Sequence, residues 1–213
     1  MAGKIPETVW LYRITNRENL AHILQYGICN KNHPDANPDF VSIGNHDIIE
    51  RRNEHRVKIE GYGNIGDYVP FYFSPKSIML YNILTGYGVS KVKPEEIIFL
   101  ITDIQSAVNC KQLYFFSDGQ ANTRISQHYN DLKDLDKIDW EVVESGDFSK
   151  SNSDNDRTRR YQAEFLIHEK VPLNCIRAIV VYNESCATFV KKKLALTGLI
   201  IQVYIKRSFY FNR

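Results

Sequence analysis

The sequence contains no apolar run that approaches the roughly 20 residues needed for a membrane-spanning helix. Its first residues, MAGKIPETVWLYRIT, also lack the apolar stretch and cleavage site of a secretory signal. Both absences argue against a membrane partner and predict a cytoplasmic protein. The composition, 43% hydrophobic and 24% charged over 213 residues, is ordinary for a globular chain, so we expect a single domain over residues 1–213.

Clustered metal ligands are lacking too. The four cysteines are scattered, with no C-x-x-C pair and no histidine nearby at metal-ligand spacing (Cys29, Cys110, Cys175 and Cys186). We therefore expect them to be reduced packing residues. The six histidines are equally dispersed, with no two at metal spacing on one helix face, so no metal site is predicted.

Signatures of the common nucleotide-dependent and hydrolytic enzymes are absent as well. There is no Walker loop, no Rossmann G-x-G-x-x-G motif, and no serine or cysteine in a nucleophile elbow. The glycine-rich GYGNIG at residues 61–66 precedes a predicted strand instead of following one, which makes it a poor phosphate-binding loop. These absences weigh against a conventional hydrolase, kinase or dehydrogenase.

The net charge of +2 is unevenly distributed. Residues 191–213 contain six Lys and Arg and no Asp or Glu, so the rest of the chain carries a net charge of −4. The last residues, IKRSFYFNR, interleave cations with Phe209, Tyr210 and Phe211. Cations neutralise phosphates and aromatic faces stack on unpaired bases, but a final strand with a solvated charged face explains the pattern equally well.

In the first part of the chain, apolar segments typical of strands alternate with amphipathic segments typical of helices. In the later part, strand-like segments predominate. Strands are predicted over residues 9–15, 69–74, 95–102, 112–119, 163–169, 175–182 and 199–206. Helices are predicted over residues 17–26, 46–56, 76–84 and 184–196. In the second of these, Ile48 and Ile49 are expected to face inward. The order fits an α+β fold with a mostly antiparallel or split sheet.

One acidic residue, Glu164, heads the apolar run FLI within RRYQAEFLIHEK. An isolated charge is rarely buried without a partner, because losing its hydration costs several kcal/mol or more. Glu164 therefore lies either harmlessly at a strand end or in a cleft, where it meets a developing positive charge. The sequence also leaves open whether Arg13, Arg52 and Tyr72 are structural or functional residues. Taken singly, each is explained by an ordinary role on the surface or in the core.

Taken together, four segments resemble the DarT family, the DNA ADP-ribosyltransferase toxins of bacterial DarT–DarG toxin–antitoxin pairs. The segments are LYRIT-x-x-ENL-x-x-IL-x-x-G, IERRN, GDYVPFYFSPKSIMLYNI and RRYQAEFLI, in this order. The resemblance runs from about residue 9 to the C-terminus, and Ile78 stands where the family pattern has proline.

The resemblance implies an ADP-ribosyltransferase fold, in which a split β-sheet and flanking helices hold NAD in a central cleft. It places Arg13, Tyr72 and Glu164 at the three strand positions that are the functional residues of that superfamily. Arg13, Ile14 and Thr15 would line the nicotinamide pocket through their backbone.

Further positions follow from the same resemblance. His22 and Asn30 would make outer NAD contacts. A segment of about residues 36–53 would close over NAD, with Arg52 as its essential residue. The long polar segment of about residues 119–164 would read the substrate before the catalytic Glu164.

The family activity is transfer of ADP-ribose from NAD to a base, thymidine, in single-stranded DNA, which releases nicotinamide and blocks replication. Arg52 would either take a proton from the base or act electrostatically. Arg157, Arg159 and Arg160 would hold DNA, with Tyr161 stacking on a base. The implied partner is a DarG-like antitoxin whose macrodomain removes the modification. The alternatives are an inactive nucleic-acid-binding module of the same fold, or transfer to RNA or protein.

Overall fold

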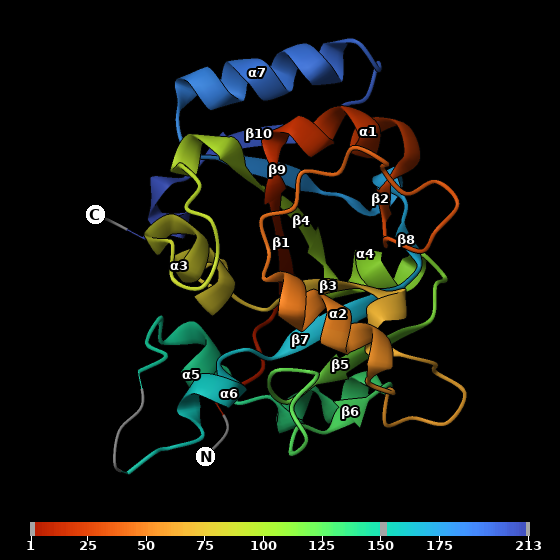
Figure 1. The fold of residues 1–213 in the computed structure, drawn as a ribbon, viewed down its shortest axis with the longest axis vertical. Helices are drawn as coiled ribbons and strands as arrows, with labels where there is room; N and C mark the ends of the chain where they lie inside the picture. The colour runs from red at the N-terminus through yellow and green to blue at the C-terminus, as the bar shows by residue number, and fades with distance from the viewer. Residues whose placement is uncertain (1–2, 150–152, 212–213) are drawn as a thin grey trace.

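The computed structural model describes residues 3–149 and 153–211, which form one large mixed sheet with helices around it (Figure 1). The strands are β1 Trp10–Asn16, β2 Ile28–Cys29, β3 Tyr68–Tyr72, β4 Ile97–Asp103, β5 Tyr114–Ser117, β6 His128–Tyr129, β7 Glu164–His168, β8 Lys170–Val171, β9 Ala178–Val181 and β10 Gln202–Ile205. The α-helices are α1 Leu20–Tyr26, α2 His46–Glu54, α3 Ile78–Thr85, α4 Ile104–Asn109, α5 Trp140–Glu144, α6 Arg157–Arg160 and α7 Glu184–Ala195. Short 3-10 turns add η1 Arg17–Asn19, η2 Ile65–Asp67, η3 Pro94–Glu96, η4 Leu132–Lys137, η5 Leu173–Cys175 and η6 Arg207–Phe209.

The large sheet has the strand order β10-β9-β4-β1-β3-β7-β5-β6. Its neighbours are antiparallel except for β9 and β10, which are parallel and are joined through α7. The predicted α+β fold with a mostly antiparallel, split sheet is therefore confirmed. Figure 1 shows α7 and α1 over the β9–β10 end, while α2 lies in front of β3 and β7.

The predicted helices begin and end where their capping residues stand. The Asn45 side chain accepts a hydrogen bond from the backbone N–H of Ile48 at the start of α2, and Ser77 does the same for α3. Gly86 ends α3 in the left-handed region. Ile78 is the first residue of α3, a position that favours proline, which explains why the departure from the family pattern is tolerated.

The aromatic end of the chain packs into the protein instead of facing a ligand. Tyr210 is buried, and its hydroxyl donates to the backbone oxygen of Ile97 at 2.9 Å. Phe209 packs edge-on against Tyr12 and Phe99. The burial of Tyr210 excludes base stacking by this residue, and Phe209 is partly buried against the same core. Both follow the end of the last strand, β10, and do not lie on it.

The expectation that all four cysteines are reduced is wrong for one pair. Cys110, which follows α4, is joined to Cys175 at the end of η5 by a disulfide, with 6.4 Å between the Cα atoms. Cys29 and Cys186 are free. The partners are 65 residues apart, so only the packing of α4 beside η5 brings them together.

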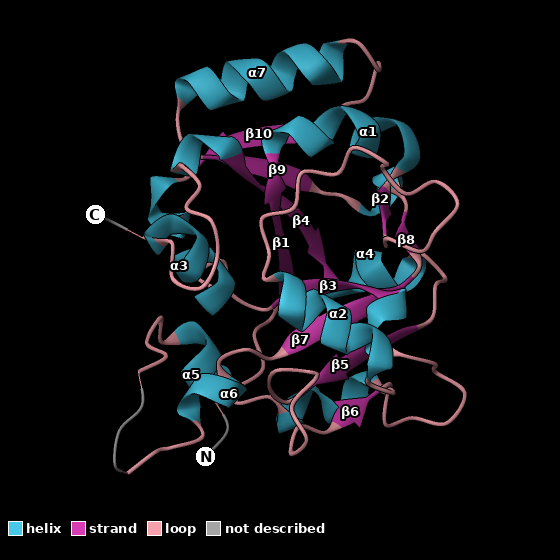
Figure 2. Cartoon of the chain, in the orientation of Figure 1, coloured by secondary structure: helices cyan, strands magenta, loops and turns pink. Residues whose placement is uncertain are grey.

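Several small elements were not predicted. β2 and β8 form a separate two-stranded sheet, and β6 adds two residues to the edge of the large one (Figure 2). These strands are too short to leave a periodic pattern in the sequence. None of the helices in residues 3–149 and 153–211 has the length and apolarity that crossing a bilayer requires.

Candidate active site

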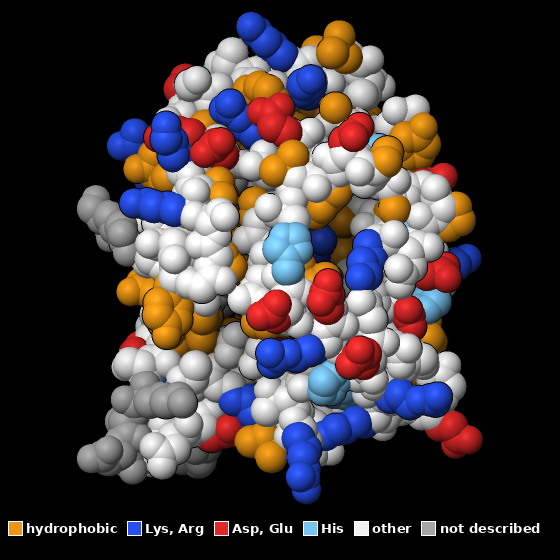
Figure 3. All heavy atoms as spheres, viewed as in Figure 1, with side chains coloured by type: hydrophobic (Ala, Val, Ile, Leu, Met, Phe, Trp, Pro, Cys, Tyr) orange, Lys and Arg blue, Asp and Glu red, His pale blue; other side chains and the backbone are white. Residues whose placement is uncertain are grey.

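A cleft opens where the two halves of the sheet separate. β1 and β3 share the single register pair Tyr12↔Tyr72, after which β1 continues to Asn16 in register with β4 alone. The space beyond that pair has a volume of about 460 Å³ and is lined by residues of β1, β3, α2 and α3 together with Glu164. Figure 3 shows the hollow at the centre of this face, with apolar side chains inside it.

Glu164 lies inside the protein and is not a harmless strand end. It is the first residue of β7, directly opposite Tyr72 of β3, and is 1% exposed. Nη2 of Arg52 lies 2.5 Å from both carboxylate oxygens, and the backbone N–H of Ala121 donates to Oε1 at 3.3 Å. Glu164 is therefore a buried carboxylate with a counter-charge, and that counter-charge is Arg52 of α2.

Arg52 keeps its charge in this setting. Burial disfavours the cation, but the negative charge of Glu164 and the hydrogen bond to it outweigh that effect, so the pKa of Arg52 is raised. An arginine that holds its proton more tightly than usual is a poor proton acceptor. Of the two roles left open for Arg52, the raised pKa favours the electrostatic one.

Tyr72 and Arg13 complete the polar floor of the cleft. Burial, assisted by the negative charge of Glu164, raises the pKa of the Tyr72 hydroxyl, which therefore remains a neutral phenol. Arg13 donates from Nη1 to the backbone oxygen of Pro70 at 3.0 Å and thereby connects β1 and β3 where their backbones no longer pair. Burial lowers the pKa of Arg13 to about 10, which leaves it a cation at neutral pH.

Of the positions expected to contact NAD, the cleft includes Arg13, Ile14, Thr15, Asn30, Arg52 and Tyr72. Asn30 is buried and donates to the backbone oxygen of Asp67 at 2.6 Å. His22 is separate. Its ring packs at a tilt against Tyr26, with 4.6 Å between the ring centroids, and it lines a small adjoining cavity that also touches Arg13 and Thr15.

Asn19 was part of a family-like segment but was not singled out as a site residue. Its amide nitrogen donates to Oγ1 of Thr15 at 3.0 Å and to the backbone oxygen of Val41 at 2.9 Å. Its amide oxygen accepts from the backbone N–H of Val41 at 2.8 Å. Asn19 thus ties the loop before α2 to the strand that lines the cleft, and its burial could not be inferred from an ENL triplet.

Helix α2 covers the cleft. No residue of α2 is fully buried, and Ile48 and Ile49, expected to face inward, are half-buried and line the cleft instead of the core. The helix is seated on η2 at Gly66, where an added Cβ would lie 2.9 Å from Cα of Asn53. Gly66 thus allows the close approach that brings Arg52 over Glu164.

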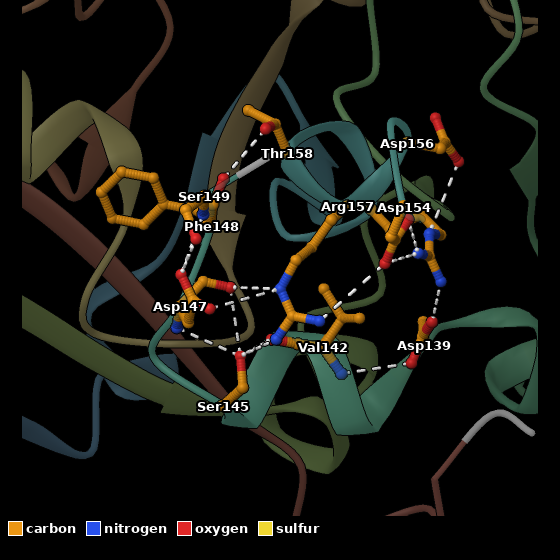
Figure 4. Close-up of polar contacts among 11 residues, drawn as sticks. Asp139, Val142, Ser145, Asp147, Phe148, Ser149, Asp154, Asp156, Arg157 and Thr158 are labelled. Carbon is orange, nitrogen blue, oxygen red and sulfur yellow. Dashed lines mark hydrogen bonds and ion pairs between the residues drawn. The ribbon is translucent and has the colours of Figure 1, made fainter. Parts of the chain in front are cut away.

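The arginines predicted to contact DNA, at the end of the long polar segment, already bind other groups of the protein. Arg159 pairs with Asp118 at 2.8 Å and Asp156 at 2.7 Å, and Arg160 pairs with Asp139 and Asp154. Figure 4 shows Arg157 directed at Ser145 and Asp147, where it donates to the Asp147 backbone oxygen at 2.9 Å.

Tyr161 is equally unsuited to its predicted role. It is 3% exposed, and its hydroxyl donates to the backbone oxygen of Lys76 at 2.5 Å. Its ring packs against Phe148 with 5.4 Å between the centroids. Stacking of Tyr161 on a base does not fit this burial. The arginines and Tyr161 hold the segment in shape, a role that their composition alone does not distinguish from DNA binding.

Known proteins share both the sequence pattern and the fold. A family model described as "ssDNA thymidine ADP-ribosyltransferase, DarT" matches residues 12–211. A DNA ADP-ribosyl transferase of Escherichia coli O127:H6 is 32% identical over 208 residues, which cover 97% of this chain and 95% of the relative.

Two solved structures are similar throughout. Thermus sp. 2.9 DarT in complex with ADP-ribosylated ssDNA has a TM-score of 0.90 at 29% identity and covers 99% of this chain and 100% of its own. The same protein in complex with NAD+ has a TM-score of 0.84 at 26% identity and covers 98% and 100%.

Proposed function

This chain belongs to the DarT family of single-stranded-DNA thymidine ADP-ribosyltransferases, and from that membership we propose how its residues perform the reaction. The enzyme transfers ADP-ribose from NAD to single-stranded DNA and releases nicotinamide. The observation that carries the assignment of roles is the buried pair of Glu164 and Arg52 at the point where the sheet splits.

Glu164 is the catalytic carboxylate in this proposal. Breaking the bond between nicotinamide and ribose leaves positive charge on the ribose. A fixed carboxylate in a cleft stabilises that charge more than it stabilises the neutral sugar, which is the condition for catalysis. The Ala121 N–H and the strand position opposite Tyr72 hold the carboxylate in place.

Arg52 has two roles in succession. Before substrate binds, it neutralises Glu164, which would otherwise be an uncompensated buried charge. When the positive ribose takes over that contact, the guanidinium is free to stabilise the negative charge that forms as the base releases its proton to water and bonds to the ribose carbon that nicotinamide has left. Because the pKa of Arg52 is raised, it acts here as a cation and not as a base.

The cleft suits NAD as a co-substrate. Beyond Tyr12, no described strand pairs with the cleft side of β1, so the backbone from Arg13 to Thr15 is available to an amide ligand such as nicotinamide. Asn30 and Tyr72 add polar groups to the cleft. His22 lies in the small adjoining cavity, beside the outer part of the NAD site. The segment of about residues 36–53 closes over the cleft and carries Arg52.

The segment of about residues 119–164 recognises the DNA, but through other residues than the arginines at its end. Arg124 and Ile125, at the tip of the turn between β5 and β6, are exposed, and among the described residues Arg124 forms no ion pair. Lys58 fixes the tip, because its Nζ donates to the backbone oxygens of Arg124 and Ser126, both at 2.6 Å. We assign the phosphate contact of this segment to Arg124.

Salt dependence separates the two assignments. Arg124→Gln is expected to weaken single-stranded DNA binding and to reduce the slope of log affinity against log salt by about 1. Arg160→Gln, the matched control, should leave the slope unchanged because its charge is already paired. A reduced slope in the Arg160 variant alone would restore the original assignment.

The acceptor is tested with labelled NAD and separate pools of single-stranded DNA, duplex DNA, RNA and protein. Label is expected in single-stranded DNA, at thymidine. Label in RNA or protein alone would favour transfer to another acceptor, and no label in any pool would favour an inactive binding module. We further infer that the activity makes the protein a toxin that blocks replication and is restrained by a DarG-like antitoxin with a macrodomain.

A further inference from the structure

A histidine outside the cleft lining makes two hydrogen bonds that define its protonation state. His128, the first residue of β6, is 9% exposed. Its Nδ1 lies 3.0 Å from the backbone N–H of Lys58, and its Nε2 lies 2.9 Å from the backbone oxygen of Ala121. A backbone N–H only donates and a carbonyl only accepts, so Nδ1 is unprotonated and Nε2 carries the proton.

The residue whose backbone oxygen His128 contacts is also the residue whose N–H faces Glu164. Ala121 is buried, accepts from Nε2 of His128 through its oxygen, and donates through its own N–H to Oε1 of Glu164. A neutral imidazole is thus linked to the carboxylate through one residue. Lys58 anchors the other side of the ring.

We propose that His128 is a positioning residue that holds the Ala121 N–H against Glu164 and so sets the orientation of the catalytic carboxylate. The inference rests on the proposed function of Glu164. It does not require His128 to touch NAD or DNA.

Acid should disrupt this arrangement. A proton on Nδ1 would face the Lys58 N–H, so two donors would oppose each other. The charged groups around the ring are Lys58, Asp118 and Glu164, and Phe115 packs against its face. Burial lowers the pKa of His128 and outweighs the hydrogen bond to Ala121, which raises it; Lys58 acts in the same direction as burial, and the two carboxylates oppose it.

The sign of the pH effect follows from that lowered pKa. The unfolded chain takes up the proton near the ordinary histidine value of about 6.5, while the folded protein resists it to lower pH. The stabilising arrangement is therefore fully present above about pH 6.5 and is lost as pH falls through the folded pKa. Transfer activity should decline over the same acid range.

Two substitutions separate the two hydrogen bonds of the ring. The amide of glutamine reaches the position of Nε2, so His128→Gln can still donate to the Ala121 oxygen. The amide of asparagine reaches the position of Nδ1, so His128→Asn can accept from Lys58 but leaves Ala121 unheld. His128→Gln should retain most of the single-turnover rate, whereas His128→Asn should lose about 10–100-fold.

The experiment measures single-turnover transfer to a thymidine-containing oligonucleotide from pH 5 to pH 8, together with NAD affinity and melting temperature. His168→Gln, on the same strand as Glu164, is the control and should behave like the wild type. We expect unchanged NAD affinity in both His128 variants and loss of the acid-range decline in His128→Gln.

Equal rates for His128→Gln and His128→Asn, or an unchanged acid decline in His128→Gln, would overturn the inference. If His128→Asn does not fold, the pH profile of His128→Gln decides alone. Failure of the proposed function is a different result, because the wild type would then transfer no ADP-ribose at any pH.

Discussion

Replacing Glu164 by glutamine is expected to lower the rate of ADP-ribose transfer by about 10²–10³-fold, the usual effect of removing one preorganised electrostatic group. The substitution nearly keeps the shape of the side chain, but it turns one acceptor oxygen into an NH2 donor and removes the charge that stabilises the positive ribose. Because Glu164 is 1% exposed, no other carboxylate or water can replace it from solution.

Single-turnover transfer with saturating NAD measures this effect, because product release is then excluded. Glu50→Gln is the matched control, since Glu50 is the other acidic residue that lines the cleft but is exposed. We expect the Glu50→Gln control to retain most of its rate and to melt near the wild-type temperature, whereas Glu164→Gln should melt lower because it leaves Arg52 without a counter-charge. A Glu164→Gln enzyme with an undiminished rate would remove the carboxylate from the mechanism.

Replacing Arg52 by lysine is expected to separate its two roles. Nη2 alone bridges both oxygens of Glu164 at 2.5 Å, and a single ammonium can make that contact. Lysine should therefore preserve stability but lack the remaining guanidinium nitrogens that serve the acceptor base. We expect a loss of about 10²-fold in the transfer rate with a near-normal melting temperature.

Arg52→Ala is the companion variant. It leaves the buried Glu164 without a counter-charge and should cost about 3–5 kcal/mol of unfolding free energy in addition to activity. Urea unfolding measures the loss of stability in Arg52→Ala. The pH–rate profile of Arg52→Lys tests whether ADP-ribose transfer needs the guanidinium. Full activity of Arg52→Lys with an unshifted profile would refute an essential guanidinium. A profile shifted toward the lower pKa of lysine would instead make residue 52 the base.

Local pattern was sufficient to predict the elements that hold the site. The continuous apolar run that became β4 and the caps at Asn45 and Ser77 depend on near neighbours in the chain, so the sequence shows them directly. The resemblance then placed Arg13, Tyr72 and Glu164 on strands, and the structure brings these three residues to one cleft. Their individual roles remain proposals.

What could not be predicted depends on contacts between distant residues. Arg52 and Glu164 are 112 positions apart, and nothing in either local segment shows that they pair. The arginines at the end of the long segment stand close to aspartates in the sequence, yet only the folded loop shows that those charges cancel. His128 left no signal at all, because its hydrogen bonds are to backbone groups of Lys58 and Ala121.

The most direct measurement is a crystal structure of the Glu164→Gln enzyme with NAD bound. The account predicts that the ribose next to nicotinamide lies within hydrogen-bond distance of the residue 164 side chain, with nicotinamide against the backbone of Arg13–Thr15 and α2 closed over both. A dinucleotide bound elsewhere, or a ribose turned away from residue 164 in this cleft, would contradict it.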